Sequence, residues 1–246
     1  MRKSLLTLCI LVAVAAISRP LLHAFPKKYA ISHENTVSED RKLSGFKKIE
    51  VSGAFEIKLI KSNTYSVKVE SEEKELSRTK TIVNGDKLII SYDKDGKDYN
   101  YKKHVKITVI VETPELNALT CSGAVELASI GNFESEKFEL KTSGATEVAM
   151  ELTAKLLISK FSGATEVKLK GKVDTHALEM TGASELEASN LEVNKYAIES
   201  KGAADCKIFV KEELAVSGSG ASSIKYKGSP LKISKDTRGA VDISVL

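Results

Sequence analysis

The stretch Ser162-Gly163-Ala164-Thr165-Glu166-Val167-Lys168-Leu169 shows how this 246-residue chain is built, because near-copies of it recur along the sequence. From Gly123 onward the glycines of these copies lie about 18 to 21 residues apart, a period typical of repeats that stack on one another. Glycine suits a position where the chain turns, since it adopts positive φ without steric cost. The copies begin at Ser52, Ser122, Ser143, Ser162, Thr181, Lys201, Ser219 and Arg238.

Polar and apolar residues alternate on both sides of each glycine, which is the period of a β-strand with one buried face. No segment shows helical periodicity. We therefore predict an all-β fold, a parallel β-solenoid in which consecutive copies stack and share one core. An antiparallel sandwich is the alternative. The fourth residue after each glycine is expected to point inward: Ile57, Leu127, Val148, Val167, Leu186, Cys206, Ile224 and Ile243.

The N-terminus has the features of an export signal. Met1-Arg2-Lys3 precedes an apolar run from Leu5 to Ile17, which is too short to span a membrane fully. We assign residues 1–24 to a signal peptide, with an uncleaved anchor as the competing interpretation, and residues 25–44 to a polar linker. The protein is then exported to the periplasm, the cell surface or the medium, with no stable membrane span after cleavage.

The folded part is expected to be one domain, residues 45–246, with a less regular β portion at 45–115 and regular repeats at 116–246. In the first portion, Asn84-Gly85-Asp86 predicts a hairpin turn between two apolar segments. Residues 72–78 are a charged stretch that forms one helical turn or a loop. Residues 93–103 form a polar loop, in which Tyr99 and Tyr101 are available for contact with a ligand.

Charge and cysteine content exclude some classes of function. The net charge is +4 with acids and bases interleaved, whereas a nucleic-acid-binding protein needs a basic face. Cys121 and Cys206 lie four repeats apart, or roughly 19 Å at about 4.8 Å per stacked strand. Because a disulfide needs Cα atoms within about 7 Å, we expect both to be buried free thiols.

The third residue after each glycine is acidic in all copies but one, where Ser223 replaces it. If the copies stack, carboxylates line up about 4.8 Å apart, and a hard cation such as Ca²⁺ could bridge them. The simpler interpretation is a solvated outward face, balanced by lysines at the fifth position such as Lys168. The metal-ligand candidates of the cation hypothesis are Glu126, Glu147, Glu166 and Glu185; otherwise no cofactor is expected.

The serines and threonines before the glycines are a second repeated column. A catalytic serine needs a neighbouring base, but His176 is the single histidine of the repeats and occupies a strand position equivalent to that of Phe138 and Tyr196. We therefore expect the hydroxyls to bond backbone groups at the turns and His176 to be a packing residue. The few Cys and His also lack the spacing of zinc ligands. No catalytic residue is predicted.

Several motifs together resemble one exported bacterial family. They are the repeated Ser-Gly-Ala-Thr-Glu-Val units, the opening Gly45-Phe46-Lys47-Lys48-Ile49-Glu50-Val51-Ser52-Gly53-Ala54, and Thr113-Pro114-Glu115-Leu116 before the regular array. The family is the "putative auto-transporter adhesin, head GIN domain" family of Bacteroidetes-type bacteria, and the resemblance covers nearly all of residues 45–246. It implies an exported right-handed parallel β-helix, and it brings no catalytic residues with it.

The leading hypothesis is a non-enzymatic exported protein that adheres to or binds glycans or cell-envelope proteins. One alternative is a carbohydrate-active enzyme, a glycosidase or lyase on the same scaffold. The other is a structural envelope protein that assembles end to end through exposed strand edges.

Overall fold

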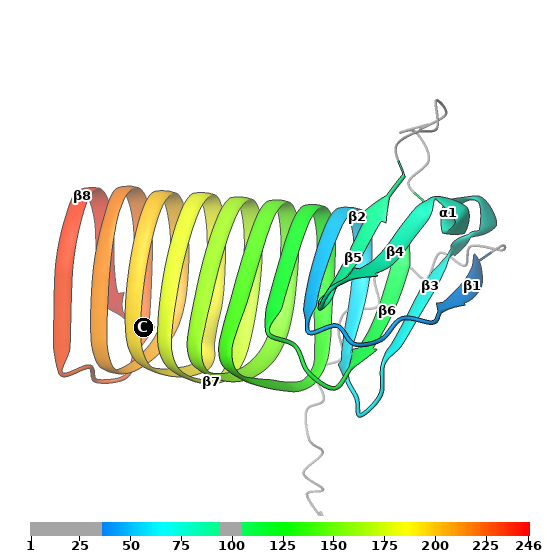
Figure 1. Cartoon of the computed structure of the whole chain (residues 1–246). Coiled ribbons are helices and arrows are strands. Elements are labelled where there is room, and N and C mark those ends of the chain that lie inside the picture. The colour runs from blue at the N-terminus through cyan, green and yellow to red at the C-terminus, as the bar shows by residue number, and fades with distance from the viewer. Residues whose placement is uncertain (1–35, 94–104) are drawn as a thin grey trace, which may run out of the picture. The chain divides into compact units, whose positions relative to one another are not determined.

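The computed structural model describes residues 36–93 and 105–246. The predicted signal peptide, Tyr99 and Tyr101 lie outside the described residues. Residues 35–246 belong to one compact unit, and no described helix is long and apolar enough to cross a membrane. The elements are β1 (Thr36–Arg41), β2 (Lys48–Lys61), β3 (Ser66–Glu72), α1 (Glu73–Arg78), β4 (Thr79–Asn84), β5 (Lys87–Tyr92), β6 (Thr108–Thr113), β7 (Ala118–Lys227) and β8 (Lys232–Val245) (Figure 1).

All the strands belong to one mixed sheet. Strand β2 pairs in parallel with β5, β6 and β7, and β7 pairs in parallel with β8. The pairs β1–β3, β3–β6 and β4–β5 are antiparallel. Strand β7 is a continuous stretch of 110 residues that winds in successive coils beside β2 (Figure 1).

The all-β class is confirmed, but the prediction of a regular right-handed parallel β-helix is wrong. The sheet is a nearly closed, barrel-like mixed sheet that contains both parallel and antiparallel pairs. The physical reason lies between Ser66 and Thr113, where the chain carries no copy of the repeat. There the tight turn at Gly85, with φ of +62°, joins β4 and β5 as a hairpin, and a two-residue hairpin turn requires antiparallel strands.

The copies of the repeated motif lie directly against one another. In the β2–β7 pair, Ser52 faces Ser122 and Gly53 faces Gly123. A Cβ atom added to Gly163 would lie 2.6 Å from the carbonyl oxygen of Gly144, so the backbones approach too closely for any side chain. The same contact joins each repeat glycine to the preceding one as far as Gly239, which faces Gly220.

The core lies inside the coils and follows the alternation in the sequence. The inward residues expected at the fourth position after each glycine are buried as far as Ile224, and Ile243 in the last coil is partly buried. Cys121 and Cys206 are buried free thiols, as predicted, and burial raises the pKa of each to about 12. They therefore pack as small apolar side chains rather than react as thiolates.

Strand β1 falls in the segment that was predicted to be a linker. Residues Thr36 to Arg41 pair with β3 from Glu72 to Val67, yet five of the six are exposed. Backbone hydrogen bonds rather than apolar burial hold this strand, so its sequence contains no hydrophobic period that could predict it.

Candidate binding groove

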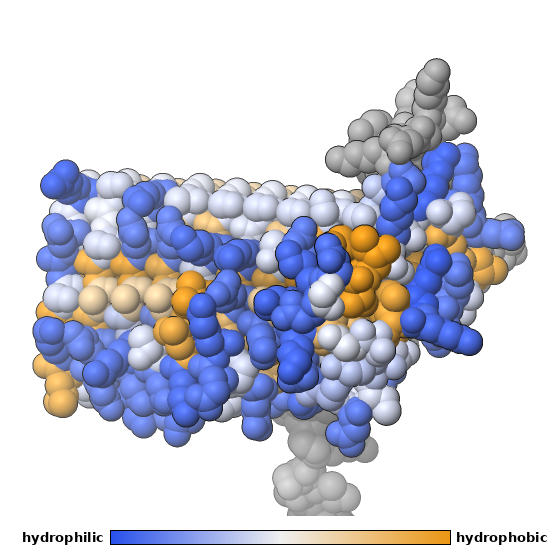
Figure 2. Space-filling view, viewed as in Figure 1, coloured by the Kyte–Doolittle hydropathy of each residue, from blue (hydrophilic) through white to orange (hydrophobic). Residues whose placement is uncertain are grey.

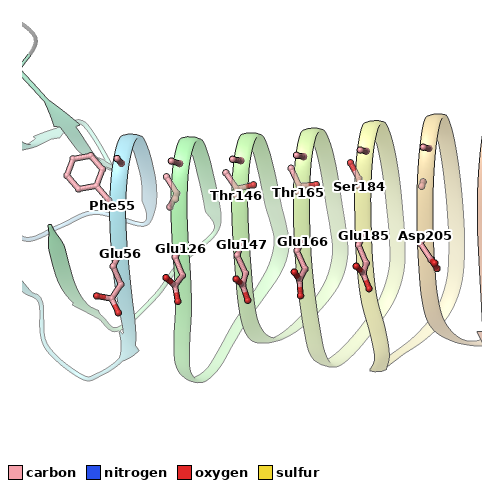
Figure 3. Close-up of a pocket in the computed structure, with 18 of the residues that line it drawn as sticks. Phe55, Glu56, Glu126, Thr146, Glu147, Thr165, Glu166, Ser184, Glu185 and Asp205 are labelled. Carbon is pink, nitrogen blue, oxygen red and sulfur yellow. The ribbon is translucent and has the colours of Figure 1, made fainter. Parts of the chain in front are cut away.

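A shallow groove of about 1170 Å³ runs along the coils beside the column of glycines. Seven of the eight copies of the motif contribute the three residues that follow the glycine, and the last copy contributes Ala240 alone, so the lining repeats from coil to coil (Figure 3). We call it the acidic groove. One coil supplies Ala145, Thr146 and Glu147, and the next supplies Ala164, Thr165 and Glu166.

The alternation of the strand explains the shape of the groove. The first and third residues after glycine point outward and the second points inward, so Ala145 and Glu147 are exposed while Thr146 is buried. A short alanine beside a long carboxylate leaves a trough along the coils. The floor is therefore formed of alanine methyl groups and backbone, and one edge is formed of acids.

The four predicted metal-ligand candidates all lie in the acidic row of this groove. Figure 3 shows the side chains of Glu126, Glu147, Glu166 and Glu185 side by side, each from a different coil. Among the described residues, no group of three or more His, Cys, Asp or Glu is arranged to hold a metal ion. The carboxylates therefore form a row rather than a convergent ligand set, and calcium binding remains a prediction.

The lysines that were expected to balance the acids do so in only one place. Lys168 Nζ lies 2.6 Å from Glu166 Oε1 and 3.5 Å from Glu147 Oε1. Lys207 pairs instead with Glu187, outside the groove. Of the carboxylates in the row, Glu126, Glu185 and Asp205 make no ion pair with any described residue; each lies on an exposed position. These three carboxylates therefore lack a direct ion pair within the described part of the chain, although the charges of Glu185 and Asp205 help to raise the pKa of Lys207.

The end of the groove nearest the irregular strands is built differently. Glu56 Oε2 accepts a hydrogen bond of 2.7 Å from Thr108 and lies 2.8 Å from Lys106 Nζ. Burial raises the pKa of Glu56, but hydrogen bonds from Lys106 and Thr108 outweigh it, so the net pKa is lowered. Glu56 is therefore a carboxylate at neutral pH. Lys106 lies just before β6 and Thr108 begins it, so both lie outside the repeats and the repeat pattern does not predict them.

A second groove of about 490 Å³ crosses the same coils on another part of their surface. It also has an alanine floor, at Ala177, Ala197 and Ala215. Two of its three acids are paired, however: Glu179 lies 2.8 Å from Lys160, and Glu199 lies 2.5 Å from Lys201. On the face drawn in Figure 2, residues of intermediate hydropathy likewise run in pale rows along the coils beside hydrophilic residues. We call this second groove the paired groove, after the ion pairs of Glu179 and Glu199.

His176 is a packing residue, as predicted. Its ring is fully buried, lies 4.9 Å from the ring of Tyr196, and places Nε2 2.8 Å from Ser159 Oγ. Burial lowers the pKa of His176 to about 3, so the imidazole is neutral. A side chain enclosed in the core cannot act as a base on a molecule bound in either groove.

The hydroxyl column before the glycines has the predicted structural role. Ser122 Oγ donates to the carbonyl oxygen of Val51 at 3.1 Å, and Thr181 Oγ1 donates to that of Phe161 at 3.2 Å. Ser162 makes the equivalent bond to Thr142. Each acceptor belongs to the preceding coil, so these hydroxyls link neighbouring coils.

Comparison with solved structures finds this fold in bacterial proteins described as putative adhesins. A crystal structure of a "putative adhesin" from Bacteroides fragilis NCTC 9343 has 25% sequence identity and a TM-score of 0.80, covering 87% of this chain and 98% of that chain. A "putative adhesin" from Parabacteroides merdae ATCC 43184 has 14% identity and a TM-score of 0.70, with coverage of 87% and 97%. At that identity the likeness shows the fold alone.

A "putative lipid binding protein" from Parabacteroides distasonis ATCC 8503 shares the fold as well, with 18% identity, a TM-score of 0.66 and coverage of 87% and 98%. No curated protein matches the chain. The family model described as "Putative auto-transporter adhesin, head GIN domain" matches residues 45–230. Since that match spans well over half of the sequence, the protein belongs to this adhesin head GIN domain family.

Proposed function

We propose that this protein is an exported, non-enzymatic adhesin that holds an extended polymer of the cell surface or envelope in the acidic groove. One observation carries the proposal: all eight copies of the motif contribute an alanine to the groove lining, and six of them add an acid. A lining that repeats along one direction suits a ligand that also repeats. The eight copies of the motif, spaced about 4.8 Å apart, give a groove roughly 34 Å long, which exceeds the length of a single sugar or amino acid.

The charge of the groove favours a ligand with positively charged groups. Glu126, Glu185 and Asp205 make no ion pair with a described residue, and the only lysine in the lining is Lys106 at one end. Ammonium groups of a ligand would complement these carboxylates, and its apolar parts would cover the alanine floor. Amino sugars in a glycan and lysines in an envelope protein carry the same ammonium group, so both kinds of polymer share this chemistry.

The carbohydrate-active enzyme alternative lacks support from the acids of the groove. Glycosidases need two carboxyl groups with different roles, of which the general acid has a raised pKa. Here the acids recur in equivalent positions, and Glu56, which has a distinct environment, has a lowered pKa. Lowering the pKa removes the proton that a general acid must donate at neutral pH.

Export is part of the proposal, and N-terminal sequencing of the mature protein tests it directly. The expected result is a new N-terminus within or just after residues 1–24, with the protein recovered outside the cytoplasm. A full-length chain that stays in the cytoplasm would contradict both export and adhesion.

The binding experiment uses an array of amine-bearing, neutral and acidic glycans together with basic and neutral peptides, and a turnover assay on every ligand that binds. The combined variant Glu126→Gln/Glu185→Gln/Asp205→Asn removes the three carboxylates that make no ion pair with a described residue. Its matched control, Glu179→Gln/Glu199→Gln, removes carboxylates from the paired groove. We expect amine-bearing ligands to bind about tenfold more weakly to the first variant, which corresponds to about 1.4 kcal/mol, and unchanged to the control.

Three results would contradict the proposal. They are exclusive binding of acidic or neutral ligands, equal effects of the two variants, and turnover that a single acid-to-amide change abolishes. The last would establish the enzyme alternative. If the array distinguishes glycans from peptides, it also decides which polymer the groove holds.

A further inference from the structure

The C-terminal end of the coils leaves one strand edge open. Among the described residues, β8 pairs only with β7, so the backbone groups on its other side have no strand partner. Apolar side chains that are buried in the preceding coil become exposed here. Leu214 is fully buried, whereas Ile233 in register with it is 41% exposed, and Val245 is 68% exposed. An open edge with apolar side chains is a template for another β-strand.

Lys235 interrupts this surface at a specific position. It lies in register with Val216. Each of these residues lies four positions before a stacked glycine, and the same position in the two preceding coils is occupied by Ile198 and Leu178. All three of these apolar side chains are buried. In the last coil the column therefore ends with an ammonium group, which is exposed and makes no ion pair with any described residue.

At the opposite end of the coils the free edges belong to β1 and β4, which are six-residue strands outside the coils. There β2 pairs with β7 on one side and with β5 and β6 on the other, and β4, β3 and β1 extend the sheet further (Figure 1). A second copy that stacked on β8 to continue the core would therefore have to use its own β8. The expected partner of this end is the same end of another molecule.

We propose that Lys235 prevents a second copy of this chain from docking on the C-terminal coil. Stacking another coil against β8 would bury the Lys235 ammonium group without a counter-charge, which is strongly unfavourable. Inward-pointing charges are one of the ways in which natural sheets protect an open edge. The residue thus keeps the molecule from associating end to end and leaves the acidic groove of each molecule free along its length.

A symmetric pairing of two β8 edges shows the same conflict in more detail. If two copies pair antiparallel around Gly239, residues at equal distances from it face each other, and inward residues face inward residues. Thr237 then faces Val241, but Lys235 faces Ile243 and Asp236 faces Asp242. Like charges directly opposite each other destabilise a strand pair, so Asp236 adds to the effect of Lys235.

The test measures mass by light scattering and sedimentation over a hundredfold range of concentration. We expect the wild-type chain to remain monomeric and Lys235→Leu to form dimers or larger species at the upper concentrations. Lys225→Leu is the matched control, because Lys225 is exposed on the side of the preceding coil and has no ion pair with a described residue. Lys235→Arg keeps the charge and should behave as wild type.

Circular dichroism melting curves of each variant ensure that association is measured on folded protein. Wild-type protein that already associates through β8 would overturn the proposal, and so would equal behaviour of Lys235→Leu and Lys225→Leu. The result of the association test is independent of the binding experiment, since a protein that stays monomeric can still fail to bind any surface polymer.

Discussion

Gly163 in β7 and Gly85 between β4 and β5 both have positive φ, +96° and +62°, but they have different surroundings. A Cβ atom on Gly163 would lie 2.6 Å from a backbone oxygen of the preceding coil, whereas one on Gly85 would meet nothing within 4 Å. Glycine in the coils is required by neighbours roughly 20 residues away in sequence, and glycine in the hairpin is required only by its own turn. The regular coils are thus held by contacts between copies, and the irregular strands by local turns and individual side-chain bonds.

The largest loss of stability is expected from substitution of these glycines, and comparing the two positions tests the difference between the regions. Gly163→Ala combines a left-handed backbone penalty with a backbone clash, so we expect it to lower the free energy of unfolding by about 3–5 kcal/mol. Gly85→Ala carries only the backbone penalty, about 1–2 kcal/mol. Urea denaturation of both variants measures the difference. Equal losses would mean that the contact between coils does not limit stability.

A second effect concerns the core of the coils, where His176 is buried and neutral. The folded pKa of His176 is about 3 and the ordinary pKa of histidine is 6.5, so below pH 6.5 the unfolded chain binds a proton that the folded chain does not. Stability therefore falls as the pH decreases from about 6.5 toward 3, by about 1.4 kcal/mol per pH unit at most.

We expect His176→Phe to remove this pH dependence, so that near pH 4 the variant melts at a higher temperature than the wild type. At pH 7 it should be slightly less stable, because Ser159 loses its hydrogen bond. Tyr196→Phe is the matched control, since the buried Tyr196 hydroxyl has no hydrogen-bond partner among the described residues. Thermal melts at several pH values decide the matter, and the same slope in all three proteins would contradict the explanation.

A smaller effect lies at the junction between the two regions. Glu56→Gln weakens the ion pair of β2 with Lys106, just before β6, and the hydrogen bond with Thr108, the first residue of β6. Because Glu56 is partly exposed, we expect a loss of only about 1 kcal/mol at pH 7. Since the pKa of Glu56 is lowered in the folded state, this stability exists above the unfolded pKa of about 4.5 and disappears as the pH falls through the folded value.

Chemical denaturation of Glu56→Gln at pH 7 and at pH 3 measures this loss. Glu126→Gln, in the same groove row but without an ion pair to a described residue, should change stability very little. If Glu126→Gln destabilises as much as Glu56→Gln, the junction has no special role.

The smallest expected effect is that of Lys168→Gln. Lys168 bridges Glu166 and Glu147 in two neighbouring coils, but all three side chains are about half exposed. Exposed ion pairs typically contribute about 0.2–1 kcal/mol. The change in melting temperature should be close to zero at high salt. A loss above about 1 kcal/mol would show that ion pairs, and not only the backbone contacts, hold the coils together.

The candidate site was only partly predictable. The acids that form the row were identified from their position after each glycine, because a fixed register aligns equivalent residues. The alanine floor and the contribution of Lys106 were not, since a groove depends on the relative lengths of neighbouring side chains and on where β6 meets β2. The copies that hold Glu126 and Glu185 carry Ala128 and Glu187 at the fifth position, so the sequence already offers them no lysine. For Asp205 the structure decided, because Lys207 forms its ion pair with Glu187 instead.

The stretch around Gly163 determined by itself that copies lie in register, that Val167 and its equivalents point inward, and that Glu166 and its equivalents point outward. These properties follow from the period-two geometry of a strand and from the steric freedom of glycine, which operate within a few residues. Only the tertiary structure decided that the sheet is mixed rather than a regular parallel β-helix, that β1 joins it from a polar segment, and that Lys235 ends an apolar column. Each of these depends on which strands pair across long separations in sequence. Backbone hydrogen bonds decide that pairing, and a local apolar pattern does not predict them.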